Sequence, residues 1–343
     1  MLRDELLRRF PALATLPAHA EAVGGAVRDL MLRAEPADVD VECDEPLACA
    51  SRVGKVITLG RGDLQVYRVV LADRIYDFSR RMDLGRRDFT MNAIAVDLTS
   101  GEMRDPFKGV ADIERRNVRM ISPGNFQDDP LRMLRAVRLA VQFDFAVEAE
   151  TIAAIRRRAE QIVTVAAERV RYELDAIFSM NRFRRAVALL HETALDEPLF
   201  GYAFDPERFH DAVVSMAGSY ALLLRDPRGF AKRWKWSGAL LREVLTLQGL
   251  MRDASIIALY DAGESIARQL PALLRAVGRE PVTIPEIFNT RSLLDGNEIA
   301  ALAGIEEGPR LGAIKRALLE AQLRGDVRTR EEAVEFVRVS SRA

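Results

Sequence analysis

The chain has 343 residues, a hydrophobic content of 49% and a formal net charge of −1 at pH 7. This length predicts roughly two to four subdomains, and no apolar run approaches the ~18–20 residues that cross a bilayer. Three histidines and no CxxC pair argue against a histidine-rich or zinc site, and two cysteines favour a reduced, cytoplasmic compartment. The near-neutral charge does not by itself support a nucleic-acid partner, so local patterns must decide.

The predicted elements change in character along the chain. MLRDELLRRF reads as a charged amphipathic helix, and a mixed pattern extends to about Asp105. The predicted strands are Glu21–Val23, Asp38–Cys43, Lys55–Leu59, Gln65–Leu71, Arg74–Ser79 and Ala93–Leu98, and the predicted helices are Ala26–Arg33 and Pro46–Val53. Leu71–Arg74 resembles a hairpin turn, and from Ala111 onward almost everything has helical periodicity. The sequence therefore predicts an α/β head followed by a long helical remainder.

Two glycines precede the first helix of this head. Gly24 and Gly25 let backbone N–H groups approach a phosphate closely, and a helix N-terminus favours anions. A Gly-Gly pair before a helix is also a common turn, so the pattern is weak by itself.

Paired carboxylates follow on the next predicted strand. Side chains alternate along a strand, so Asp38, Asp40 and Glu42 share one face while Val39 and Val41 share the other. Mg²⁺ usually takes one or two carboxylates and completes its shell with water and phosphates. A solvated strand face is the simpler interpretation, but phosphate-binding glycines within twenty residues favour nucleotide chemistry.

Two arginine-rich segments come later. Arg86 and Arg87 precede the last head strand, where they could bind a triphosphate or pair with the head's own acids. Arg132, Arg135 and Arg138 then follow one another at three-residue spacing, with no acid between them. Neighbouring like charges repel by a few tenths of a kcal/mol per pair, which a bound anion or planar base would relieve.

The start of this arginine helix also has a structural interpretation. Asp129 before Pro130 is typical of an N-cap with proline at the first helical position, and Leu131, Leu134 and Val137 supply a core-facing stripe. Downstream, ERVRYEL places Glu168 and Arg169 near another helix start, where a structural role is the simpler interpretation.

Taken together, these segments resemble the class II tRNA nucleotidyltransferase and poly(A) polymerase family, of the bacterial CCA-adding type. The resemblance rests on VGGAVRD, the DVD pair, RRDFTMNA, DPFKGVADIERRNVRMIS, DDPLRMLRAVRLA and ERVRYEL, in the family's order over residues 20–180, with a weaker match near the end. It implies an α+β fold: a nucleotidyltransferase head with a mixed β-sheet (1–115), then an all-α neck (116–200), body (201–285) and tail (286–343). The tail is expected to contact tRNA.

The same resemblance implies a nucleotidyl transfer in which an RNA 3′-hydroxyl attacks the α-phosphate of CTP or ATP. Asp38 and Asp40 would hold Mg²⁺ and carry the catalysis. Gly25 and Arg28 would contact the incoming nucleotide, and Arg87 its phosphates.

Base choice would depend on the arginine helix. Asp129 would accept from the exocyclic amine of C or A while Arg132 donates to the ring nitrogen, and Arg135 and Arg138 would help to fix the nucleotide. U and G present the opposite pattern and would leave buried groups unpaired, at about 1–3 kcal/mol or more.

This sequence departs from the family pattern in a few places. Asp128 stands where relatives often carry glutamate, and no histidine-aspartate hydrolase domain follows the body. Asp77, which is not one of these departures, could be a third acid on a neighbouring strand, but a solvated or salt-bridged aspartate is the simpler interpretation. The segment SRRMDLG (79–85) is shorter than the flexible loop of CCA-adding relatives, which favours addition of CC only. A poly(A) polymerase and a catalytically silent RNA-binding module are the alternatives to an enzyme that builds the 3′ CCA end of tRNA.

Overall fold

The computed structural model describes residues 2–60, 62 and 65–342, and the chain forms two compact units. The first extends to Met180 and includes Arg185–Pro206, and the second holds Asn181–Arg184 and the described residues from Glu207 onward. The predicted α+β fold class is confirmed, whereas the division at residues 115, 200 and 285 stays a prediction. The N-terminal helix is α1 (Leu2–Arg9), and Met1 of the predicted helix lies outside the described residues.

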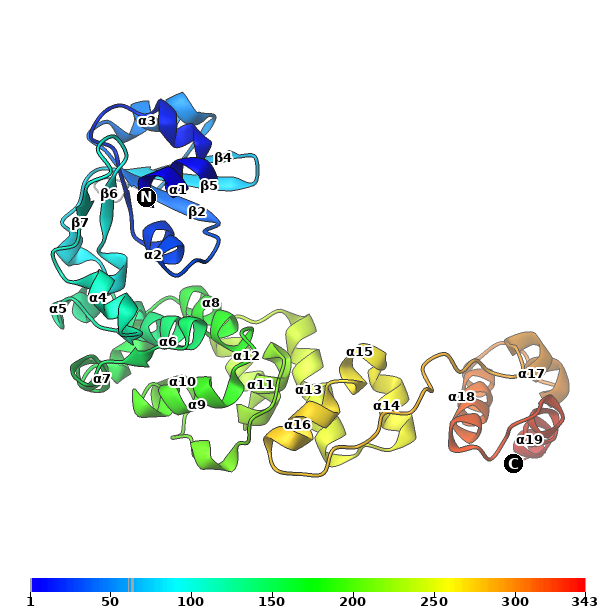
Figure 1. The fold of residues 1–343 in the computed structure, drawn as a ribbon. Helices are drawn as coiled ribbons and strands as arrows, with labels where there is room; N and C mark the ends of the chain where they lie inside the picture. Colours follow the sequence, from blue (N-terminus) through cyan, green and yellow to red (C-terminus); the bar gives the residue numbers. More distant parts are fainter. Residues whose placement is uncertain (1, 61, 63–64, 343) are drawn as a thin grey trace. The chain divides into compact units, whose positions relative to one another are not determined.

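A mixed seven-stranded sheet forms the head, in the order β3-β4-β5-β2-β1-β6-β7 (Figure 1). Only β2 and β5 pair in parallel; the other neighbours are antiparallel. Its elements are η1 (Pro11–Thr15), β1 (Glu21–Val23), α2 (Gly25–Met31), β2 (Asp38–Glu42), α3 (Pro46–Val53), β3 (Val56–Leu59), β4 (Val66–Leu71), β5 (Arg74–Ser79), η3 (Leu84–Arg86), η4 (Thr90–Asn92), β6 (Ala95–Asp97) and β7 (Met103–Arg104).

The two faces of the sheet differ in polarity. Val39, Val41, Tyr76 and Phe78 are buried on one face, where Phe10 packs edge-on against Tyr76 with ring centroids 5.5 Å apart. The other face carries the carboxylates of β2, as strand alternation predicts. The register aligns Asp40 with Asp77 of β5, and Asp77 in turn with Arg68 of β4. The apolar face anchors the strands, so the polar face can be used for chemistry.

The predicted strands and helices of the head are present: β1, β5 and α3 have the predicted bounds, and the ends of the others shift by one or two residues. The turn between β4 and β5 has Ala72 and Asp73 at φ 49° and 63°, which is the left-handed pair that a tight hairpin requires. The helix predicted at Ala26–Arg33 begins one residue earlier and ends at Met31, and Arg33 has φ 58°. Strand β7 was not predicted, because two residues are too few to show an alternating pattern.

The helical part of the first unit packs around α6. Its elements are α4 (Gly109–Glu114), β8 (Asn117–Val118), α5 (Gly124–Asp128), α6 (Leu131–Phe143), β9 (Ala146–Val147), α7 (Ala149–Arg156), η5 (Ala159–Thr164), α8 (Ala167–Phe178), α9 (Phe183–Glu192) and α10 (Asp196–Phe200). Leu131, Leu134 and Val137 of α6 are buried, as the periodicity predicts, and α6 packs on α8. The parallel pair β8–β9 interrupts a region predicted to be almost entirely helical.

The second unit is helical. After η6 (Pro206–Arg208) its helices are α11 (Met216–Leu223), α12 (Pro227–Arg233), α13 (Gly238–Arg252), α14 (Ile256–Ala262), α15 (Glu264–Ala267), α16 (Leu270–Ala276), α17 (Gly296–Ala303), α18 (Pro309–Arg324) and α19 (Arg330–Arg342). One core joins α13, α14 and α16, and another, around Ile299, Leu318 and Val337, joins α17, α18 and α19.

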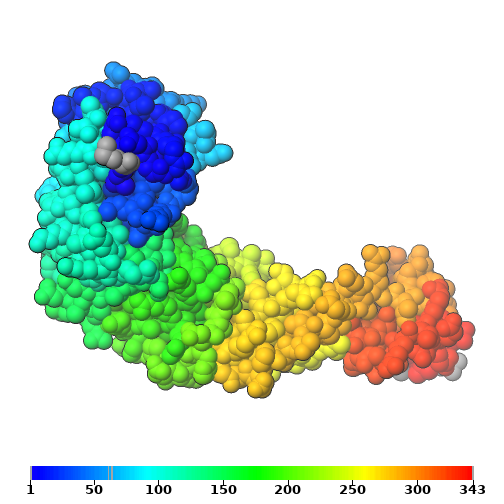
Figure 2. Space-filling view, in the orientation of Figure 1, coloured from blue at the N-terminus to red at the C-terminus, as the bar shows by residue number. Residues whose placement is uncertain are grey.

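On the surface of the head, Figure 2 shows α1 in dark blue beside the cyan segment that follows β6. Arg3 of α1 donates to the carbonyl of Leu98 at 2.8 Å, which ties the N-terminal helix to this segment. Among the described residues, no helix combines the length and apolar character of a membrane span.

Candidate active site

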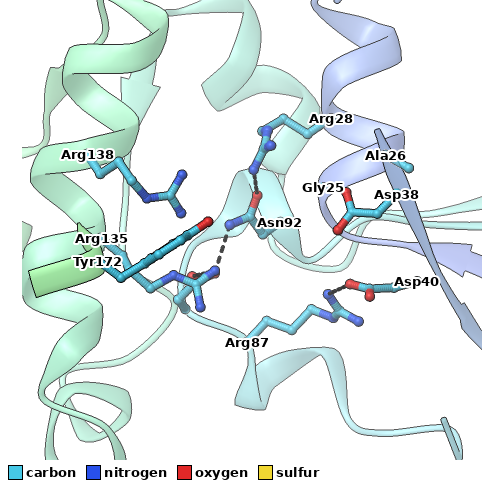
Figure 3. Close-up of a pocket in the computed structure, with 11 residues that line it drawn as sticks. Gly25, Ala26, Arg28, Asp38, Asp40, Arg87, Asn92, Arg135, Arg138 and Tyr172 are labelled. Carbon is cyan, nitrogen blue, oxygen red and sulfur yellow. Dashed lines mark hydrogen bonds and ion pairs between the residues drawn. The ribbon is translucent and has the colours of Figure 1, made fainter. Parts of the chain in front are cut away.

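A pocket of about 340 Å³ opens where the polar face of the sheet meets α6 and α8 within the first unit (Figure 3). Its lining brings together residues far apart in sequence, namely Gly25, Ala26, Arg28, Asp38, Asp40, Arg87, Asp88, Asn92, Arg135, Arg138 and Tyr172. Seven of the ten residues predicted for the site line it: Asp38, Asp40, Gly25, Arg28, Arg87, Arg135 and Arg138. The predicted carboxylate and arginine groups therefore face one cavity.

Asp38 and Asp40 form the carboxylate wall. Burial raises the pKa of Asp40 to about 6; Arg87 opposes this shift, while Asp38, Asp77 and Glu42 add to it. The Asp40 side chain nevertheless keeps 47% of its accessible surface, because it faces the open pocket. A cation placed between Asp38 and Asp40 would relieve this concentration of negative charge.

The acids that flank this pair are compensated by arginines. On the same sheet face, Arg104 binds Glu21 at 2.9 and 2.6 Å, and Arg68 binds Asp77 at 2.8 and 2.7 Å. Asp77 is therefore the salt-bridged aspartate that the simpler interpretation expects. Among the described residues, Asp38 and Asp40 lack a close arginine of their own, and Arg87 Nη1 lies 3.9 Å from Asp40.

This arrangement suits a divalent cation that is shared with phosphate. Two carboxylates on one strand face the cavity, and no group of three or more histidine, cysteine or acidic residues that could enclose a metal exists in the described part of the chain. Mg²⁺ is bound in this way, by one or two carboxylates with water and substrate phosphates as the remaining ligands. The donor set at Asp38 and Asp40 therefore fits Mg²⁺.

The two glycines have different roles. Gly24 has φ 76°, and a Cβ there would lie 2.4 Å from Arg87 Nη1 and 3.4 Å from Asp40 Oδ2. Gly24 thus makes room for the Arg87 guanidinium, which lines the pocket, and Gly25 lines the pocket at the first residue of α2. Of these two positions, the one of Gly24 accepts only a glycine without strain.

A chain of hydrogen bonds and one ion pair runs from α2 to α6 along the pocket lining. Arg28 donates to Asp29 and to Asn92 Oδ1 (2.6 Å), and Asn92 donates to Asp88 Oδ1 (2.9 Å). Arg135 of α6 reaches the other Asp88 oxygen at 2.9 Å. Burial raises the pKa of Asp88, but Arg135, Asn92 and the Phe89 N–H outweigh it and hold the pKa below its ordinary value. Asp88 therefore stays ionised and joins the sheet to the arginine helix.

The row of arginines on α6 is less isolated than its sequence indicates. Arg135 pairs with Asp88, and Arg138 donates to Glu173 of α8 at 2.5 Å. Acids from other elements therefore already offset part of their mutual repulsion, and relief by a bound anion or planar base stays a prediction. Both arginines still line the pocket and can reach a ligand.

Asp129 and Arg132, predicted to read the base, do not line the pocket. Asp129 Oδ2 accepts from Arg169 at 2.8 Å, and Arg132 donates to the carbonyl of Asn125 at 3.3 Å. The predicted N-cap also differs, since α6 begins at Leu131 after Pro130 and Asp129 Oδ1 accepts from the Leu131 N–H at 3.2 Å.

Four pocket residues were not predicted, and one of them, Ala26, follows the two glycines directly. Asp88 and Asn92 lie in the RRDFTMNA segment, and Tyr172 lies in ERVRYEL, where only Glu168 and Arg169 were considered. Tyr172 is 70% exposed, which is unusual for an aromatic side chain, and Figure 3 shows its ring beside Arg135 and Arg138. An aromatic residue on the polar side of an amphipathic helix is the signal in the sequence.

The short connection after β5 is held against the sheet. Arg81 donates to the carbonyl of His19, and the Met82 N–H donates to Glu42 at 3.2 Å. Asp83 caps η3 by accepting from the Gly85 N–H at 2.9 Å, and Leu84 is buried. The segment 79–85 is therefore anchored at several points along its length.

Comparisons with known proteins agree with this geometry. Residues 65–119 match the family described as "Poly A polymerase head domain", and residues 144–207 match "Probable RNA and SrmB- binding site of polymerase A". A CC-adding tRNA nucleotidyltransferase from Synechocystis sp. is 40% identical over 185 residues, covering 50% of this chain and 44% of the relative. A CCA-adding enzyme from Lactococcus lactis is 26% identical over 97% of this chain and 96% of its own length.

Solved structures match over the whole chain. The Bacillus stearothermophilus CCA-adding enzyme in complex with CTP has a TM-score of 0.80 at 26% identity, covering 99% of this chain and 98% of that one. The Thermotoga maritima CCA-adding enzyme complexed with tRNA has a similar fold, with a TM-score of 0.74 at 22% identity over 99% and 94% of the two chains. Over nearly its whole length the chain is therefore similar to CCA-adding enzymes, and two of its segments match models of poly(A) polymerase domains.

Proposed function

We propose that this protein is a tRNA nucleotidyltransferase that adds C from CTP to the 3′ end of tRNA without a nucleic-acid template and releases pyrophosphate. The observation that carries the proposal is the pocket, in which the Asp38–Asp40 wall faces Arg28, Arg87, Arg135 and Arg138. A nucleoside triphosphate needs both kinds of wall, because its phosphates bind arginine and share a cation with carboxylates. The relatives named for CC and CCA addition support tRNA as the acceptor.

In the reaction, the tRNA 3′-oxygen forms a bond to the α-phosphorus of CTP, and the bond from that phosphorus to the β-phosphate oxygen breaks. Asp38 and Asp40 would hold Mg²⁺, whose chemistry is to activate the hydroxyl and neutralise phosphate charge. The Arg87 guanidinium lies beside Asp40, where it can bind the phosphates as their charge moves to the leaving pyrophosphate. Arg28 is held by Asp29 and Asn92 and would orient the nucleotide at the α2 side of the pocket.

For base choice we retain Asp129 and Arg132 as the proposed reading pair, with one requirement. Asp129 is paired with Arg169, so Arg169 must release it before it can accept from the base amine. Arg169 is 53% exposed in its side chain, and exposed ion pairs contribute only about 0–1 kcal/mol, so this release is inexpensive. Arg135 and Arg138 would fix the ribose and phosphates nearer the pocket floor.

The decisive experiment incubates purified protein with tRNA ending at the discriminator base, with Mg²⁺ and with CTP and ATP separately and together. We expect CTP to extend the tRNA by a defined number of residues, and Asp38→Ala to abolish the extension. Asp44→Ala is the matched control, because Asp44 lies just beyond the same strand with its side chain 82% exposed and outside the pocket. Long heterogeneous A tails would support a poly(A) polymerase, and no extension by the wild type would refute the proposal.

We further propose that the product is CC, with A added by a separate enzyme. The segment 79–85 is short and is held by Glu42 and His19, so it has little freedom to move. It can therefore do little to adapt the site from C to the larger A. The Synechocystis relative named as a CC-adding enzyme is consistent with this reading. Efficient single-A addition to a tRNA-CC substrate at physiological ATP would overturn it while leaving C addition intact.

We place this activity in the cytoplasm. Cys43 and Cys49 are both free in the structure, and free thiols are typical of a reducing compartment. Localisation of a tagged full-length protein by cell fractionation would test this.

A further inference from the structure

Glu42 is the third acid on the pocket face of β2, and it is fully buried. One of its oxygens accepts from Arg87 Nη2 at 3.0 Å, and the other accepts from the Met82 N–H at 3.2 Å. It does not line the pocket, so it does not reach a bound nucleotide itself. A buried carboxylate costs stability unless its partners are held well, and here both oxygens have a donor.

Arg87 lies between two carboxylates at different distances. Its Nη2 is 3.0 Å from Glu42, whereas its Nη1 is 3.9 Å from Asp40. A close arginine–carboxylate pair has an N–O distance of about 2.8 Å, so a shift of about 1 Å would bring Arg87 into full contact with Asp40. Arg87 would then compete with any cation for that carboxylate.

We propose that Glu42 is a positioning residue: it holds Arg87 off Asp40, so that Asp40 remains open to a divalent cation, and it ties the 79–85 segment to the same arginine. The inference deepens the proposed function and rests on it, since it concerns the cation and phosphate side of that site. Through Met82, a movement of the segment would be transmitted to Glu42 and then to Arg87. The carboxylate thus acts through Arg87 rather than on the substrate.

The neighbouring strand supplies a matched control. Glu21 of β1 is aligned directly with Glu42, is 4% exposed and binds Arg104 through two hydrogen bonds. Arg104 does not line the pocket. Glu21→Gln therefore perturbs a similarly buried carboxylate that is paired with a more exposed arginine on the same sheet face, without touching the cation side of the site.

The test measures binding of Mn²⁺ alone to the full-length protein by paramagnetic resonance, without nucleotide or RNA. We expect Glu42→Gln to weaken Mn²⁺ binding by about tenfold, as loss of a supporting partner typically does, and Glu21→Gln to leave it within about twofold of wild type. The double variant Glu42→Gln/Arg87→Met should recover the wild-type affinity, because the competing guanidinium is gone.

Three results would overturn the inference: unchanged Mn²⁺ binding in Glu42→Gln, an equal loss in Glu21→Gln, or no recovery in the double variant. If the single variant does not fold, the double variant decides, because it removes both charges together, and a tenfold loss of Mn²⁺ affinity there would refute the proposal. CTP incorporation by the wild type is measured separately, and its absence would refute the proposed function whatever the Mn²⁺ data show.

Discussion

Replacing Gly24 by alanine tests whether the head is built around the position of Arg87. Gly24 has φ 76° and ψ −128°, a backbone conformation that an L side chain adopts only with strain of about 1–3 kcal/mol. Its new Cβ would also lie 2.4 Å from Arg87 Nη1, which must move and weaken its hydrogen bond to Glu42, worth about 1.5–3 kcal/mol. We expect Gly24→Ala to destabilise the head by about 3 kcal/mol and to raise the KM for CTP.

Gly25→Ala is the control for this substitution. A Cβ at Gly25 would meet nothing nearer than Arg28 Nη2 at 3.6 Å, and alanine is favoured over glycine in a helix by about 1 kcal/mol.

Both tryptophans, Trp234 and Trp236, lie in the second unit, so their fluorescence would not report on the head.

Hydrogen exchange of the amides in β1 and β2 is the suitable assay, because it measures the opening free energy of the head directly. Gly24→Ala should speed this exchange by about 10²-fold, which corresponds to about 3 kcal/mol, while Gly25→Ala should leave it unchanged or slow it. Equal protection in the two variants would show that neither the left-handed backbone nor the contact with Arg87 constrains the head.

Three further substitutions test separate parts of the site. Without metal, Asp40→Asn should stabilise the head by about 1 kcal/mol at pH 8, because the raised pKa of Asp40 makes its ionised form costly in the folded state; the partial exposure of Asp40 makes the gain smaller than the full pKa shift would give. Thermal melts should show this gain in stability disappear as the pH falls through 6 toward 4, and no gain at pH 8 would contradict the prediction. Tyr172→Ala should raise the KM for CTP or the RNA end by roughly tenfold if its exposed ring stacks on a base, and unchanged steady-state constants would exclude stacking. Arg132→Ala should narrow the preference for CTP over UTP in single-turnover assays, whereas equal slowing with both nucleotides would assign Arg132 to phosphate.

The sequence predicted the parts of the site that depend on local geometry. Strand alternation placed Asp38 and Asp40 on one face and Val39 and Val41 on the other, and the structure has the same arrangement. Helical periodicity likewise predicted the buried stripe of α6. These features depend on a few consecutive residues, so a single sequence contains them.

The partners of these residues depend on contacts between distant segments, and for that reason they could not be predicted. Arg135 has no acid on its own helix, yet it reaches Asp88, which is 47 residues earlier in the chain. The pairing of Asp129 with Arg169 is hidden in the same way, because 40 residues separate them. The sequence left Arg87 with two readings, phosphate binding or pairing with acids, and the structure shows the pairing together with exposure to the pocket.

The charges on the sheet face explain why the cation and the phosphates would meet at one place. Glu21 and Glu42 each have a close arginine within the sheet region, and so does Asp77. Among the described residues, Asp38 and Asp40 are the less compensated pair, with Arg87 Nη1 3.9 Å from Asp40. A cation is attracted to Asp38 and Asp40 because arginines already neutralise the three neighbouring carboxylates, so the charge of the cation is not shared among five carboxylates. The arginines of the opposite wall are paired with acids but still line the pocket, so a triphosphate that bridges the two walls can reach both. The pairing of the flanking acids is therefore as important to the site as the two aspartates it leaves open.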